Sequence, residues 1–491
     1  MVEVNRRTLL RGAAAVGAGL AAGPFTGFLA PAGAEPVEQR RELLAVPDLR
    51  DGQVRLHLPE GFTYRSFHDT EYAATLDDGT VLPGRHDGMG AFHGSDNSYL
   101  LVRNHEVNGP GAAFGPAGTV YDQAARGGTT TVEVTGDGQV LRSYTSISGT
   151  QNNCSGGIMP WGAWITCEET VNGPDVGPDF TGVSNAPLTK PHGFIFEVPA
   201  DGLAEPQPIR SAGRFSHESV AYDPRAGILY LTEDNFGFAS GFYRYVPPQH
   251  PEHGPGVGGP THQRLADAGR LQMLKVKGQP NANLAAAQPA GATYDVEWVD
   301  IDDPAPTFAG PATTTNNDAL CYVGNQGRAQ GAAWFSRLEG SAYDRGVVYF
   351  TATQGGGPAE TSVGPIADGF GNGSGQIWAY HTAEQVLRLA YESPGPQTLD
   401  FPDNVTVSPR GTLVVCEDNI NDNYLRGLTR GGQLFDIALN RLFSKDGVTK
   451  RWDDEFAGST FSPDGRTLFV NIQASRGMTF AIWGDWGRIG V

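Results

Sequence analysis

Residues 153–169 read NCSGGIMPWGAWITCEE, and the fold prediction starts from this segment. It begins with a thiol, Cys154, passes through a Pro-Trp-Gly turn and continues as a run of β-forming residues that ends in two carboxylates, Glu168 and Glu169. If both ends of this hairpin lie on one face of a sheet, the thiolate suits a thiophilic metal and the carboxylates suit a hard cation such as calcium. Taken by itself, the pattern is also typical of a buried cysteine followed by an exposed acidic strand end.

The same pattern recurs along the chain. Each time, an anchor residue precedes a turn and a short apolar β-forming run that ends in polar groups. The anchors recur at intervals of about 60 residues, with one interval about twice as long. They are Asp87, Cys154, Glu218, Glu339, Asp403 and Gly458. Repeats of this length, joined by turns such as DPRAG and SPDG, predict an all-β fold, a six-bladed β-propeller.

Two segments interrupt the repeat. Residues 250–311 are rich in Gly, Pro, His and Ala, and residues 355–375 are rich in Gly. Such compositions are typical of loops. We therefore expect both segments to be loop insertions over one face of the propeller.

The predicted propeller brings many metal-ligand side chains together. The inner strand of a blade and its neighbour are antiparallel, so the start of the first and the end of the second lie at the same mouth of the central channel. This geometry places Cys154, Glu218, Glu339 and Asp403 around the axis. Just outside them we expect Glu168, Glu169, Glu233, Asp234, Glu417 and Asp418. Because so many acids at one mouth would repel one another without bound cations, the sequence predicts a metal cluster.

The composition and the start of the chain predict the compartment. The 491-residue chain has a formal net charge of -19, which argues against nucleic acid and anionic membrane surfaces as partners. Arg6 and Arg7, a mildly apolar run and an Ala-Gly-Ala site resemble a Tat signal, with an ordinary Sec signal as the alternative. We expect residues 1–34 to be this signal and residues 35–491 to form one propeller domain. The Tat machinery would then export it to a periplasmic or extracellular space, and no later segment is apolar enough to span a bilayer.

The four cysteines could form two disulfides in an exported protein, and their spacing does not determine the pairing. Cys154 is expected to stay reduced because it occupies an anchor position that carries a carboxylate in other repeats.

Many of these segments together resemble the PhoX-type alkaline phosphatase family. The similarity includes GRFSHE at residues 213–218, RLEG at 337–340 and FSPDGRTLFVN at 461–471, and it extends in order over nearly all of the chain after the signal. The resemblance implies a Tat-exported six-bladed propeller that binds iron and calcium and hydrolyses phosphate monoesters. It also implies that the anchors Cys154, Glu218, Glu339 and Asp403 are the central metal ligands, and that Arg337 is a catalytic residue that clamps the phosphate.

Other interpretations stay open at this point. The chain could be a calcium-bound propeller that binds a ligand or partner without chemistry, with Cys154 as a core thiol. A calcium-dependent lactonase also uses a central metal in a propeller, but it needs no thiolate. Arg337 could be only a structural ion pair with Glu339, and His105 and His217 could brace neighbouring acids rather than bind a metal.

Overall fold

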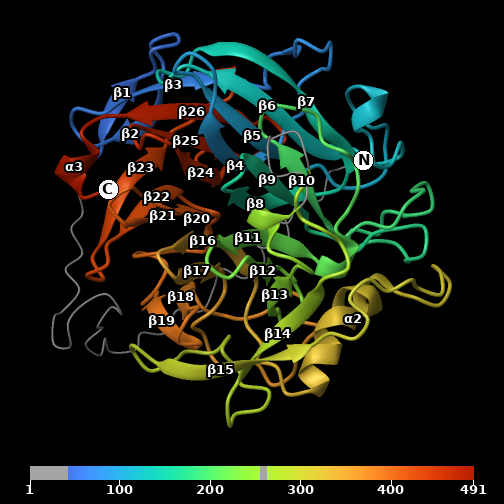
Figure 1. The fold of residues 1–491 in the computed structure, drawn as a ribbon. Helices are drawn as coiled ribbons and strands as arrows, with labels where there is room; N and C mark the ends of the chain where they lie inside the picture. Colours follow the sequence, from blue (N-terminus) through green and yellow to red (C-terminus); the bar gives the residue numbers. More distant parts are fainter. Residues whose placement is uncertain (1–41, 255–262) are drawn as a thin grey trace.

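Six inner strands form a closed ring in the computed structural model, which describes residues 42–254 and 263–491 (Figure 1). In order around the axis they are β4 (His86–His93), β8 (Asn153–Met159), β11 (His217–Asp223), β16 (Leu338–Asp344), β20 (Pro402–Val407) and β24 (Phe456–Phe461). The arrangement is all-β and propeller-like, as predicted. The predicted signal, residues 1–34, lies outside the described residues.

From each inner strand the chain continues outward through antiparallel strands. The first sheet contains β4, β5 (Tyr99–His105), β6 (Gly127–Val134) and β7 (Val140–Thr150). The second contains β8, β9 (Ala163–Glu168) and β10 (Ile195–Pro199).

A nine-stranded sheet contains two of the inner strands. It begins with β11, β12 (Ile228–Glu233), β13 (Phe242–Val246), β14 (Arg270–Val276) and β15 (Thr293–Asp300). It continues with β19 (Val386–Glu392), β18 (Gln376–His381), β17 (Val347–Ala352) and β16. The two halves join where β15 pairs with β19, with Tyr294 opposite Leu387. The described residues therefore form five hydrogen-bonded sheets and not six separate ones.

The prediction that residues 250–311 form a loop insertion is wrong in part. This segment contributes β14 and β15, which extend the sheet outward from β13. The Gly, Pro and Ala residues lie mainly around these strands, so the average composition hid the β-forming runs LQMLKV and YDVEWV. Residues 355–375 contain no named strand or helix, as expected for a loop.

The start of the described chain completes the last two sheets. One contains β20, β21 (Leu413–Glu417), β22 (Tyr424–Leu428) and β23 (Leu434–Asn440), followed by β2 (Val54–Leu58) and β1 (Leu44–Pro47). The other contains β24, β25 (Thr467–Ile472), β26 (Met478–Trp483) and β3 (Thr63–Phe67). Leu56, Tyr64, Phe456 and Phe480 pack in one buried core cluster of these two sheets. The N-terminal strands therefore close the ring against the C-terminal ones.

Helices contribute little. The described helices are α2 (Asn316–Ala329), α3 (Trp486–Ile489) and the 3-10 turns η1 (Ala117–Thr119), η2 (Arg210–Ala212) and η3 (Pro251–His253). Helix α2 begins at a capping box between Thr315 and Asp318. It approaches β14 closely, because a Cβ on Gly327 would lie 2.3 Å from the sulfur of Met273. Within the described ranges, no helix has the length and apolar character needed to cross a membrane.

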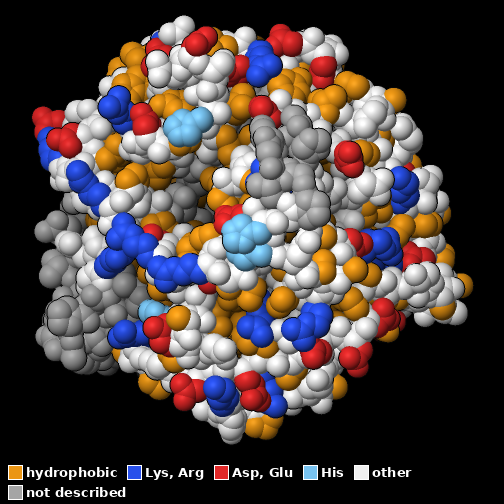
Figure 2. Space-filling view, viewed as in Figure 1, with side chains coloured by type: hydrophobic (Ala, Val, Ile, Leu, Met, Phe, Trp, Pro, Cys, Tyr) orange, Lys and Arg blue, Asp and Glu red, His pale blue; other side chains and the backbone are white. Residues whose placement is uncertain are grey.

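The outer surface carries both signs of charge. On the face shown in Figure 2, acidic and basic side chains are interspersed among apolar ones. Acidic side chains are most concentrated at the axis of the ring.

Each inner strand is irregular at its predicted anchor. The pairing register shifts at Asp87, Cys154, Glu218, Glu339, Asp403 and Gly458, so that two residues of the inner strand oppose one of its neighbour. This is the arrangement of a β-bulge, which locally bends a strand and redirects a side chain. The sequence repeat thus marks the same backbone feature six times in the described chain.

Hydrogen bonds from side chains next to one inner strand hold the anchor backbone of the following inner strand in place. Asn104 donates to the carbonyl of Cys154 at 2.9 Å, and Thr232 donates to the carbonyl of Glu339 at 2.6 Å. The side chains of Thr351 and Asn471 donate in the same way to the carbonyls of Asp403 and Asp87, at 2.7 and 2.6 Å. Each of these side chains comes from the strand next to one inner strand and reaches the following inner strand around the ring. We call these four bonds the anchor bonds.

We expect Thr351→Val to destabilise the fold by about 1 to 2 kcal/mol, because it leaves a buried carbonyl without its donor while keeping the side-chain shape. Chemical denaturation of the variant and the wild type measures this difference. The control is Thr293→Val at the exposed first residue of β15, which should change stability by less than about 0.5 kcal/mol. Equal effects at the two positions would show that the anchor bonds do not stabilise the ring.

Candidate metal centre and substrate cavity

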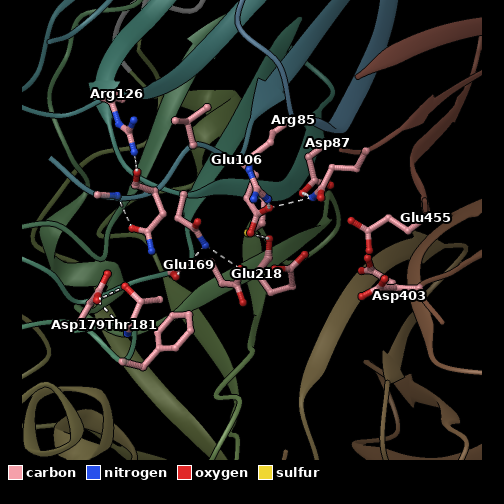
Figure 3. A pocket seen from close by; sticks show the side chains of 18 of the residues that line it. Arg85, Asp87, Glu106, Arg126, Glu169, Asp179, Thr181, Glu218, Asp403 and Glu455 are labelled. Carbon is pink, nitrogen blue, oxygen red and sulfur yellow. Dashed lines mark hydrogen bonds and ion pairs between the residues drawn. The ribbon is translucent and has the colours of Figure 1, made fainter. Parts of the chain in front are cut away.

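A cavity of about 550 Å³ opens where the inner strands begin. Its acidic lining comes from anchors, from strand ends and from the residues before β24 (Figure 3). The carboxylates at its walls are Asp87, Glu106, Glu169, Asp179, Glu218, Glu339, Asp403, Asp418 and Glu455, and Cys154 lies among them. The predicted gathering of anchors at one mouth is therefore present in the structure.

Two groups of possible ligands meet at Glu218. Ligand atoms of Cys154, Glu169 and Glu218 all lie within 4.8 Å of one another. Ligand atoms of Glu218, Glu339 and Asp403 satisfy the same limit. One group contains sulfur and oxygen, and the other contains oxygen only. The two groups are adjacent because they share a carboxylate.

Cys154 sits at the bulge of β8 and is buried, with 3% of its surface exposed. Its Sγ lies 3.2 Å from the carbonyl oxygen of His217 and 3.6 Å from that of Glu218. Burial raises the pKa of this thiol well above its ordinary value, and the carboxylates of Glu218 and Glu169 raise it further. All four cysteines are free, including Cys154. A cation at this position would favour the thiolate over the thiol.

A second set of acids lies next to these groups. Gln473 donates from Nε2 to Asp87 at 2.7 Å and to Glu106 at 2.9 Å. The other oxygen of Asp87, Oδ1, is buried and has no hydrogen-bond partner among the described residues. A buried carboxylate oxygen without a donor is costly, so its presence here indicates a site for a cation.

The acids raise one another's pKa. Burial is the largest cause and raises the pKa of Asp87, Glu218 and Glu339 well above their ordinary values, with further contributions from neighbouring carboxylates. For Asp403, burial and then Glu455 raise the pKa to about 8. Without a cation these groups hold protons near neutral pH, whereas a bound cation would favour their charged forms.

The structure separates the paired acids at the ends of β9, β12 and β21. Glu168, Glu233 and Glu417 do not line the cavity. Glu168 accepts from the backbone N–H of Gly193 at 2.8 Å and lies 2.6 Å from the ring of His192. The other two acids also accept hydrogen bonds outside the cavity. Glu233 accepts from Gly241 and Tyr243. Glu417 accepts from Asp400, Tyr424 and Arg426.

The second acid of two of these pairs faces the cavity. Glu169 and Asp418 line the cavity, and Asn152 donates to Glu169 at 2.9 Å. Successive side chains of a strand point to opposite faces, so adjacent acids cannot both face the same cavity. This alternation explains why Glu169 and Asp418 line the cavity while Glu168 and Glu417 do not.

Asp234 and Arg337 form a buried pair at the cavity wall. Arg337 lines the cavity, and its guanidinium lies 2.9 Å from Asp234 and 2.8 Å from Glu339. Its backbone has a φ of 33°, a left-handed conformation that is rare for a side chain of this size. Asp234 thus contacts the predicted catalytic arginine and does not line the cavity. The ion pair with Glu339 that the sequence allowed is also present.

The donor set fits a pair of different metals. Thiolate sulfur selects softer transition metals, whereas clustered carboxylates suit hard cations such as calcium. The unpartnered oxygen of Asp87 and the shared carboxylate of Glu218 both fit bound cations.

Sequence reasoning missed several residues of the cavity. Asp87 was recognised as an anchor but not as a ligand, and Glu106, Glu455 and Gln473 were not assigned to the site. For Glu455 there was a signal, because the sixth anchor is Gly458, which offers no ligand. A Cβ there would lie 2.2 Å from the carbonyl oxygen of Asp87, so the position admits only glycine. The carboxylate that this repeat contributes to the cavity comes from the nearby Glu455.

Within the described residues, neither histidine near the anchors forms a hydrogen bond with a carboxylate. His105 lies 2.9 Å from the carbonyl of Gly84 and 2.9 Å from the hydroxyl of Thr130. His217 bonds the carbonyl of Gly213 at 2.9 Å. The interpretation that they brace neighbouring acids is therefore not supported by their hydrogen bonds within the described chain.

Comparison with solved structures finds one of similar fold and others that match this chain more distantly. Pseudomonas fluorescens PhoX, solved in complex with the transition-state analogue vanadate, is 16% identical, with a TM-score of 0.62 over 92% of this chain and 98% of that chain. A gluconolactonase from Xanthomonas campestris gives 15% identity and a TM-score of 0.37 over 91% of this chain and 99% of that one. A streptogramin B lyase is 10% identical, with a TM-score of 0.36 over 86% of this chain and 98% of that chain.

No curated protein matches the sequence. One protein family does match it, the family described as alkaline phosphatase PhoX, over residues 44–475. This match includes all six anchors and the cavity residues described above. The chain belongs to the PhoX family of alkaline phosphatases.

Proposed function

We propose that this protein is an exported phosphatase that hydrolyses phosphate monoesters at an iron and calcium centre. The observation that carries the proposal is the meeting of Cys154, three anchor carboxylates and Arg337 in one cavity of a chain from a family of metal-dependent phosphatases. Export rests on the twin arginines at the start of the sequence. We also propose that the ring comprises six blades, one for each inner strand, two of which share a sheet.

The two ligand groups suggest which residues hold each metal. Cys154, Glu169 and Glu218 would hold iron, because a thiolate favours it over calcium. Glu339 and Asp403, with Asp87 and Glu106 nearby, would hold calcium through oxygen ligands. When bound, these cations would neutralise charge on the phosphoryl oxygens and activate water.

Arg337 would bind and orient the phosphoryl group. A guanidinium is planar and matches phosphate with parallel donors. Its contact with Asp234 fixes the plane of the guanidinium, because Nε and Nη2 both donate to that carboxylate, at 3.2 and 2.9 Å. The fixed plane would present a preorganised positive charge where negative charge develops in the reaction.

We expect Cys154→Ser to lose iron while retaining calcium, because the variant removes the sulfur ligand and leaves the carboxylates. Elemental analysis and the visible absorption spectrum of the purified protein check this. The matched control is Cys167→Ser, since Cys167 is equally buried but does not line the cavity. Full iron content in Cys154→Ser would refute the ligand assignment, and calcium without iron in the wild type would favour a binding protein without chemistry.

We expect the stability of the chelated protein to fall as pH rises from the ordinary carboxyl range through about pH 8. Asp403 and its neighbours bind protons more tightly in the folded metal-free protein than in the unfolded chain. The folded state therefore holds extra protons in this window, and it loses their stabilising contribution as they dissociate. Thermal unfolding at several pH values, with and without chelator, measures the effect.

The metal-loaded protein should behave differently, because cations bind the deprotonated acids. Chelation should thus lower the unfolding temperature most at alkaline pH. The control is Asp403→Asn, which should reduce the pH dependence of the chelated protein. A chelated wild type whose stability does not change across this window would show that the acids are solvated.

We expect Arg337→Ala to lower kcat on an aryl phosphate by about 100-fold or more, the scale of losing one preorganised donor. Metal content and steady-state kinetics are measured on the same folded sample. The control is Arg426→Ala, which removes another buried ion-paired arginine, one that contacts Glu417 and Asp436 outside the cavity. Unchanged kcat in folded Arg337→Ala would make Arg337 structural, and a fully loaded wild type without activity on any monoester would refute the phosphatase proposal.

A further inference from the structure

Three arginines line the described part of the cavity, and they differ in their partners. Arg337 is paired with Asp234 and Glu339. Arg85 lies 3.4 Å from Glu106. Arg126 forms no ion pair with a carboxylate within the described chain, although many acids share the cavity with it. Its charge is therefore not neutralised by a neighbouring side chain.

Arg126 is exposed to solvent at the cavity wall, where its stem lies against Gly111. A Cβ on Gly111 would lie 2.2 Å from its Cδ, so the arginine stem occupies space that only glycine leaves open. Its Nη2 donates to the carbonyl of Asn108 at 2.5 Å. Figure 3 shows the guanidinium on the opposite side of the cavity from Asp403 and Glu455. Arg126 is thus held at a distance from the acids on the far wall.

An apolar rim lies on the same wall. A tight turn presents Phe180, which is 53% exposed, and Val183, which is 45% exposed. Asp179 organises this turn by accepting from the backbone N–H of Thr181 at 2.9 Å and of Val183 at 3.0 Å. Gly109 connects the rim to the arginine, because a Cβ there would contact Arg126 at 3.6 Å and Val183 at 3.9 Å.

The size of the cavity leaves room beyond the phosphoryl group. A cavity of about 550 Å³ accommodates a drug-sized ligand. The part of a substrate that leaves with the ester oxygen would therefore extend from the metal groups toward another wall. On the wall of Arg126 it would meet an unneutralised guanidinium beside apolar side chains.

We propose that Arg126 binds a second anionic group on the leaving alcohol, so that the preferred substrates are phosphate monoesters whose alcohol carries a carboxylate or a further phosphate. This inference rests on the proposed function. Among acids that outnumber the basic residues, a second negative charge on the substrate would be repelled at most positions of the wall. At Arg126 it gains a charge-assisted hydrogen bond instead. Arg126 is thus a specificity-determining residue.

The test compares two esters that differ in one group. Glucitol 6-phosphate and 6-phosphogluconate share a six-carbon chain, and only the second carries a carboxylate at its far end. We expect the metal-loaded wild type to favour 6-phosphogluconate in kcat/KM by roughly 10-fold or more, the scale of a hydrogen bond to a charged group. Arg126→Ala should bring this ratio close to one, and Arg126→Lys should keep part of it. A second pair, fructose 6-phosphate and fructose 1,6-bisphosphate, distinguishes a phosphate from a carboxylate as the bound group.

The control is Arg466→Ala, which removes an exposed arginine outside the cavity and should leave the ratio unchanged. The inference would be overturned if, in both pairs, the wild type hydrolysed the two esters with the same kcat/KM. So would an Arg126→Ala variant that loses the same factor on both esters, because the arginine would then contact the scissile phosphoryl group or support the fold. If the loaded protein hydrolyses no ester, the phosphatase proposal fails, and the ratio of dissociation constants from calorimetry tests Arg126 separately.

Discussion

Repulsion among buried carboxylates at the axis is the constraint on which the rest of the structure depends. Four anchor acids and their neighbours share one cavity, and burial raises the pKa of several of them well above the ordinary range. A protein gains nothing in stability from such a cluster without cations, because each acid must stay protonated or repel the others. The thiol of Cys154 and the unpartnered oxygen of Asp87 belong to the same cluster. The axis is therefore organised for binding cations rather than for packing.

The backbone holds the anchor side chains at the axis in the same way in each inner strand. Each inner strand bulges at its anchor, which turns the side chain toward the axis, and the anchor bonds fix the backbone carbonyl of four of these residues. Since each donor lies beside the preceding inner strand, the position of each of these anchors depends on the contact between successive inner strands. The pairing of β3 with β26 joins the start of the described chain to its end and so completes the ring in which these contacts form.

Positive charge is distributed with the same selectivity. Arg337 is held by Asp234 and Glu339 at the cavity wall, where we propose that its charge acts on the phosphoryl group. Arg126 stands on another wall without a carboxylate partner in the described chain, beside an exposed phenylalanine. The two arginines would thus act on different parts of one substrate, the first on the reacting group and the second on the alcohol.

The sequence by itself determined the repeat, the β character of the chain, the family resemblance and the six anchors, because each anchor lies a similar number of residues before a β-forming run. It also pointed to Cys154 and the anchor acids as a group. It did not determine which acid of each pair faces the axis, since that depends on strand alternation and on partners such as His192 for Glu168. Only the tertiary structure joined β15 to β19, brought Glu455 and Gln473 to the cavity, and paired Arg337 with Asp234, because these contacts connect residues far apart in the chain.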